Sequence, residues 1–144
     1  MKFKPDYFKN WSDYRTPLEL DGLRRIFKAT RYSLQGLQAA WRYEPSFRQE
    51  VRALAVLTPI SMWLAESVSQ WLWLVFACLI VVITELLNSG IEAAVDRWGS
   101  EQNELIGRAK DLGSAAVFVS LMFFFLVWGT TLVDQFGLYD FWPS

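Results

Sequence analysis

The chain has 144 residues, a formal net charge of −1 and 53% hydrophobic residues, among them eight Trp and eleven Phe. That length fits a single domain, and such an apolar composition is far from ordinary soluble usage and indicates a membrane protein. The absence of histidine excludes His-based triads and His-ligated metals, and the single cysteine, Cys78, excludes an intrachain disulfide.

The first predicted element is an amphipathic helix, after a tail at residues 1–19 that has no periodicity and to which we assign no chemistry. Over 20–43, apolar residues recur at three- and four-residue spacing among basic ones, which predicts a helix lying along a membrane surface. A helix that only packs on other protein is the alternative. The apolar positions are Leu23, Ile26, Phe27, Leu34, Leu37 and Trp41.

Three apolar segments predict transmembrane helices within a domain at 44–133. Residues 112–133 are uncharged and long enough, at about 1.5 Å per residue, to cross a hydrocarbon core of about 30 Å. Residues 68–97 form one proline-free pattern, and 46–65 is a weaker candidate with a candidate kink at Pro59. The short 66–70 turn makes those two helices antiparallel neighbours. The predicted fold class is an all-α membrane protein with a further tail at 134–144.

The positive charge is distributed unevenly. Eleven of the fourteen Lys and Arg precede residue 53. By the positive-inside rule the N-terminal region and the 98–110 loop are cytoplasmic, and the C-terminal tail, which lacks Lys and Arg, is outside. This asymmetry concerns topology, and we expect no nucleic-acid partner.

A polar stripe interrupts the 68–97 segment. Its members are Glu85, Asn88, Glu92 and Asp96. At 100° per residue they share a sector of about 80° and extend about 16 Å along the helix. Intramembrane carboxylates cost about 2.5–3.5 kcal/mol each, so their default interpretation is functional. The alternative is that they only pair with one another or hold helices together.

Carboxylates on one face suit a hard divalent cation such as Mg²⁺, which takes one or two carboxylates plus substrate phosphates. Other groups of a phosphoryl-transfer site stand at the same interfacial level: Arg108, Lys110, Asp111 and Glu44. The chain has no GxxxxGK[ST], glycine-rich kinase loop, HRD or DFG motif, which excludes the common nucleotide-binding folds.

The stretch TELLNSGIEAAVDRWGSEQNELIGRAKDLGSAAV, residues 84–117, resembles the signature of the prokaryotic diacylglycerol kinases. The likeness extends back through RIFKATRYSLQGLQAAWRYEPSFRQE, residues 25–50, and covers about 25–133. It implies a homotrimeric helical bundle in the bacterial inner membrane, with one surface helix and three transmembrane helices per subunit and active sites shared between subunits. It also implies transfer of phosphate from ATP to diacylglycerol, giving phosphatidic acid at the cytoplasmic face.

The resemblance implies a role for each matching residue. Glu85 is the catalytic base for the lipid hydroxyl, Glu44 and Glu92 are the Mg²⁺ ligands, and Asn88 and Asp96 support them. The implied ATP-binding residues are Arg25, Tyr32, Glu44, Glu92, Glu101, Gln102, Asn103, Lys110 and Asp111. The implied substrate-binding residues are Arg25, Ser33, Trp41, Arg48, Gln49, Glu50, Glu85 and Ser114.

Three positions depart from the family pattern. Leu34 replaces an aromatic residue of the family's surface helix, which leaves its role in lipid contact open. Gln102 and Asn103 replace a Tyr-His pair of some members, so nucleotide contacts there are expected through the backbone. Three other functions stay open: an undecaprenol kinase, which typically lacks the Gly-Arg before AKD; a small oligomeric ion or proton pathway; and a structural subunit without activity. The pathway leaves Lys110, Asp111 and Glu44 unexplained, and the structural subunit leaves the stripe unexplained.

Overall fold

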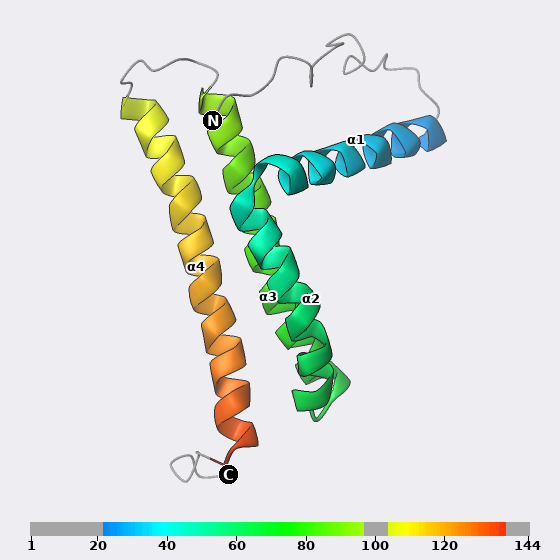
Figure 1. The fold of residues 1–144 in the computed structure, drawn as a ribbon, viewed down its shortest axis with the longest axis vertical. Helices are drawn as coiled ribbons and strands as arrows, with labels where there is room; N and C mark the ends of the chain where they lie inside the picture. Colours follow the sequence, from blue (N-terminus) through cyan, green and yellow to red (C-terminus); the bar gives the residue numbers. More distant parts are fainter. Residues whose placement is uncertain (1–21, 97–103, 138–144) are drawn as a thin grey trace. The chain divides into compact units, whose positions relative to one another are not determined.

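The computed structural model describes residues 22–96 and 104–137, and every regular element in these stretches is an α-helix. The helices are α1 (Gly22–Tyr43), α2 (Pro45–Leu64), α3 (Val68–Asp96) and α4 (Glu104–Gln135), shown in Figure 1. The all-α prediction is therefore confirmed for the described part of the chain. The predicted tail at 1–19 and residues 138–144 of the predicted C-terminal tail lie outside it.

The first three helices agree with the sequence prediction to within one or two residues at each described end. The prediction of a loop at 98–110 is wrong for residues 104–110, because α4 begins at Glu104. Arg108 donates to Glu104 at 3.0 Å one turn earlier, and these charged residues are good helix formers. Hydropathy shows where the apolar stretch begins, at Leu112, but the hydrogen-bonded helix already begins at Glu104.

Helix α1 belongs to a compact unit of its own. The six apolar residues that define its predicted membrane-facing stripe are all exposed. Its hydroxyl groups at Thr30 and Ser33 donate to the carbonyls of Ile26 and Ala29, one turn back in the same helix. An uncovered apolar stripe beside basic residues is typical of an interfacial helix, so the membrane-surface role stays a prediction for α1.

Helices α2, α3 and α4 form the second unit, in which α3 packs against both of the others. The turn between α2 and α3 is closed by Gln70, whose side-chain oxygen accepts from the Glu66 amide at 2.8 Å. The Ser67 hydroxyl accepts from the Gln70 amide at 3.2 Å, capping the start of α3. This turn makes α2 and α3 antiparallel neighbours, as the 66–70 spacing predicts.

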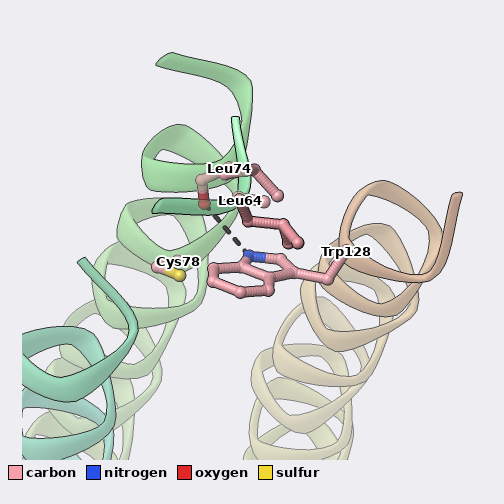
Figure 2. Packing of buried hydrophobic residues seen from close by; sticks show 5 residues of the cluster. Leu64, Leu74, Cys78 and Trp128 are labelled. Carbon is pink, nitrogen blue, oxygen red and sulfur yellow. Dashed lines mark hydrogen bonds between the residues drawn. The ribbon is translucent and has the colours of Figure 1, made fainter. Parts of the chain in front are cut away.

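Helices α3 and α4 are joined along their length by four contacts, which we call the α3–α4 seam. The contacting pairs are Asp96 with Lys110, Asn88 with Gly113, Thr84 with Ser120, and Leu74 with Trp128. Figure 2 shows the last of these, where the Trp128 ring lies beside Leu64 and Cys78 and its Nε1 donates to the Leu74 carbonyl at 3.2 Å. Cys78 is buried in this cluster, as expected for a small core residue.

Within the described residues, α3 and α4 are long and apolar enough to cross a membrane. Only 33% of the most apolar 18-residue stretch of α3, and 17% of that of α4, is buried within the chain. Such low burial argues against the core helices of a soluble fold. The exposed apolar faces require lipid or another protein surface. Helix α2 is not among these two candidates, so its predicted role as a third span stays a prediction.

Candidate active site

The polar stripe of α3 runs from the interior of the helical unit to the end of the helix. Glu85 and Asn88 are buried, with 7% and 9% of their surfaces exposed, Glu92 is half-buried, and Asp96 is exposed. The single-face arrangement expected from their spacing is therefore accompanied by graded access to solvent. The Glu85 side chain is therefore shielded from solvent, whereas Asp96 lies at the exposed end of the stripe.

The start of α2 brings further polar groups to the stripe. Glu44 directly precedes α2, where an extended backbone leads into Pro45. Burial raises the pKa of Glu44, and repulsion from Glu92 and Glu85 raises it further, while the nearby Arg48 lowers it. Three carboxylates from two elements therefore face a common region of the structure.

One turn into α2, two residues approach Glu85. The Ser46 side chain lies close to the Glu85 carboxylate. Glu50 interacts electrostatically with the same carboxylate, and its buried Oε2 has no hydrogen-bond partner among the described residues. A buried polar atom without a partner calls for an explanation, and a hydroxyl-bearing substrate is one that fits this location.

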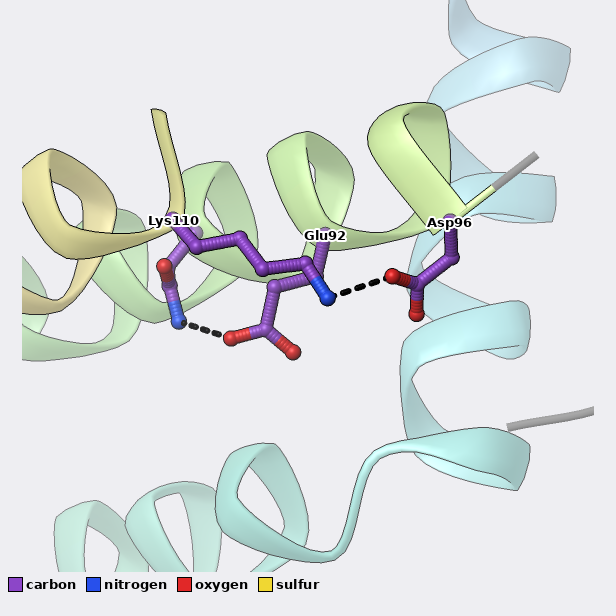
Figure 3. A network of polar contacts seen from close by, with 4 residues as sticks. Glu92, Asp96 and Lys110 are labelled. Carbon is purple, nitrogen blue, oxygen red and sulfur yellow. Dashed lines mark hydrogen bonds and ion pairs between the residues drawn. The ribbon is translucent and has the colours of Figure 1, made fainter. Parts of the chain in front are cut away.

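The Glu92 carboxylate is held from its own helix. Asn88 Nδ2, one turn earlier, donates to Glu92 Oε1 at 3.1 Å. Figure 3 shows the Lys110 side chain of α4 reaching past Glu92 to Asp96, where its ammonium group donates to Asp96 Oδ1 at 2.5 Å. Lys110 also interacts electrostatically with Glu92, so the open end of the stripe carries a cation between two carboxylates.

The residues present fit a hard divalent cation. Glu44 and Glu92 lie close enough to repel each other, and a cation between two such carboxylates relieves that repulsion. No group of three or more metal-ligating side chains occurs within 22–96 and 104–137. Mg²⁺ is typically bound by one or two carboxylates and completed by substrate phosphates and water.

Several predicted site residues are not brought together by the described structure. Arg25, Tyr32, Ser33 and Trp41 lie on α1, and their relation to the stripe stays a prediction. Glu101, Gln102 and Asn103 lie outside the described residues. Arg48 is half-buried beside Glu44, whereas Gln49, Asp111 and Ser114 are exposed.

Sequence reasoning did not single out two residues that touch the site. Ser46 lies one helical turn before Glu50 on α2, a spacing that would have placed both on the face toward Glu85. Gly113 is buried on α4 against Asn88. A glycine inside an otherwise apolar helix is a recognisable signal of close packing.

Comparison with known proteins assigns the chain to a family. Residues 31–132, more than half of the chain, match the family described as "Prokaryotic diacylglycerol kinase". The diacylglycerol kinase of Escherichia coli strain K12 is 46% identical over 116 residues, covering 81% of this chain and 95% of that protein. The diacylglycerol kinase of Haemophilus influenzae is 43% identical over 111 residues (77% and 94%), and that of Pseudomonas aeruginosa 46% over 112 residues (78% and 91%). This chain therefore belongs to the prokaryotic diacylglycerol kinase family.

Proposed function

We propose that this chain is a membrane-bound kinase that transfers the γ-phosphoryl group of ATP to the free hydroxyl of diacylglycerol, giving phosphatidic acid and ADP. The observation that carries the proposal is the proximity of carboxylates from two elements: Glu44 lies close enough to Glu85 and Glu92, and Glu50 to Glu85, for their charges to repel. Family membership supports diacylglycerol as the acceptor over an isoprenoid alcohol, since the three relatives described above are named diacylglycerol kinase.

The acceptor is activated at the buried end of the stripe. In this proposal the Glu85 carboxylate takes the proton of the lipid hydroxyl. At the same time the hydroxyl oxygen forms a bond to the γ-phosphorus of ATP, and the bond between that phosphorus and the oxygen that bridges it to the β-phosphorus breaks. The proton on Glu85 then passes to water. In this proposal Ser46 lies beside the Glu85 carboxylate and helps to orient it, and Glu50 contacts the glycerol end of the lipid.

The phosphate groups are held nearer the open end. Glu44 and Glu92 are the proposed Mg²⁺ ligands, Asn88 fixes Glu92, and Lys110 is released from Asp96 toward phosphate. When bound, Mg²⁺ would neutralise the negative charge of the ATP phosphates, and Glu44 and Glu92 would hold it. Further contacts to ATP are proposed for Arg25, Tyr32, Glu101, Gln102, Asn103 and Asp111. Further contacts to the lipid are proposed for Arg25, Ser33, Trp41, Arg48, Gln49 and Ser114.

We propose that α2 is the third transmembrane helix and that the protein is a homotrimer in the bacterial inner membrane. The 20 residues of α2 span about 30 Å, which matches a hydrocarbon core. Its exposed Val56, Met62 and Trp63 suit lipid or a neighbouring subunit. The charge asymmetry supports a cytoplasmic N-terminus and 97–103 connection and a periplasmic C-terminus.

The test uses detergent-purified full-length protein, Mg²⁺, γ-labelled ATP and a panel of lipid alcohols. Label is expected on diacylglycerol, at a rate well above that for undecaprenol. A faster rate for undecaprenol would transfer the assignment to isoprenoid alcohols. Ion conductance in liposomes without ATP consumption would instead support the ion-pathway alternative and contradict the kinase.

A further inference from the structure

Gly113 occupies a place on α4 that has no room for a side chain. A Cβ atom added there would overlap Asn88 Oδ1 and lie 3.3 Å from Asn88 Cγ. Such a Cβ would lie 3.7 Å from Asn88 Cα, which is ordinary packing, so the conflict is with the side-chain amide and not with the α3 backbone. Among the glycines that the structure describes, Gly113 alone has such a neighbour. A Cβ atom added at any of the others would meet no heavy atom of another part of the chain within 4 Å.

The orientation of the Asn88 amide follows from hydrogen-bond chemistry. A carboxylate only accepts, so the Nδ2 group of Asn88 must be the one that faces Glu92, at 3.1 Å. The Oδ1 atom is then turned toward α4, where it is buried and has no conventional hydrogen-bond partner among the described residues. Gly113 has only a hydrogen where a Cβ atom would stand, so the Oδ1 atom fits against it.

We propose that Gly113 is a positioning residue: by lacking a side chain it holds Asn88 in the orientation that donates to Glu92, and so sets the carboxylate for Mg²⁺. This step rests on the proposed kinase function, since Glu92 matters here as a metal ligand. A glycine that only permits close helix packing would affect stability but leave the Glu92 carboxylate and its metal dependence unchanged.

The test compares Gly113→Ala with Gly129→Ala, the same change in the same helix at a position with open space around the Cβ. The first readout does not need activity. The chain contains three asparagines, Asn10, Asn88 and Asn103, so asparagine-labelled protein gives only three side-chain amide signals by NMR. The Asn88 signal, identified by its loss in Asn88→Ala, is expected to shift in Gly113→Ala and to stay in place in Gly129→Ala.

The second readout is the Mg²⁺ concentration that gives half-maximal phosphate transfer. Gly113→Ala is expected to raise it at least tenfold with a smaller change in the KM for diacylglycerol, while Gly129→Ala keeps the parental value. In an Asn88→Ala background the added effect of Gly113→Ala is expected to fall below twofold, because the atom with which the new methyl group conflicts is gone.

The outcomes are distinct. An unmoved Asn88 signal, or a moved signal with parental Mg²⁺ dependence, overturns the positioning role. If Gly113→Ala does not fold, recovery of folded protein in the double variant with Asn88→Ala supports the conflict, and failure to recover shows backbone packing only. A parent protein without kinase activity refutes the proposed function by itself, while the NMR comparison still decides whether Gly113 holds Asn88.

Discussion

Replacement of Glu85 by glutamine removes the proposed base while preserving the shape of a side chain that is only 7% exposed. Glutamine has the same size and can still accept hydrogen bonds through its amide oxygen, so the helical unit is expected to keep its structure. A positioned general base contributes about 10²–10⁴-fold to a rate, or about 2.7–5.4 kcal/mol of barrier. Glu85→Gln should therefore lower kcat by at least two orders of magnitude.

The assay is the initial rate of label transfer from γ-labelled ATP to a short-chain diacylglycerol in detergent micelles, with oligomeric state measured by light scattering. Glu66→Gln is the matched control, because Glu66 is exposed in the turn between α2 and α3. It should retain the parental rate. A Glu85→Gln protein that phosphorylates diacylglycerol within threefold of the parent rate would refute the assignment of Glu85 as base.

Three further outcomes are expected. Lys110→Met should raise the KM for ATP at least tenfold, whereas Arg52→Gln, at an exposed cation of α2 to which no role is assigned, should not; equal effects would contradict a specific phosphate contact. Burial and neighbouring carboxylates raise the pKa of Glu44, so protons compete with Mg²⁺ at a higher pH than for an ordinary carboxylate. Half-saturating Mg²⁺ should therefore rise as the pH falls from neutral. A flat profile in the parent, or the same slope in Glu44→Gln, would count against Glu44. Trp128→Phe loses the bond to the Leu74 carbonyl and should cost about 1–3 kcal/mol, read as a lower unfolding temperature in detergent; an unchanged temperature would mean that this bond adds nothing.

Helical periodicity and hydropathy were sufficient to predict the first three described helices and the polar face of α3. The polar spacing on α3 survives in the structure because a helix has a fixed angular step, whatever packs against it. The start of α4 was not predicted from the sequence. Its first turns are polar, and a pattern search that follows apolar residues stops at Leu112 although the hydrogen-bonded helix starts at Glu104.

The contacts between helices could not be predicted from the sequence. The pairing of Asn88 with Gly113 depends on the rotation of α4 about its own axis, which spacing within α3 does not contain. The approach of Ser46 to Glu85 depends on how closely α2 packs against α3. In both cases a local pattern supplies one partner, and the tertiary arrangement supplies the other.

The α3–α4 seam has a mechanical consequence. Its four contacts lie at different heights along the two helices, and each depends on the same alignment. Sliding α4 by one helical turn, about 5.4 Å, would break all four together, and in hydrocarbon the exposed hydroxyl and indole groups would find no water in exchange. The four contacts therefore fix a single register of α4 against α3. We expect the motions that admit a lipid or release a product to leave this register unchanged.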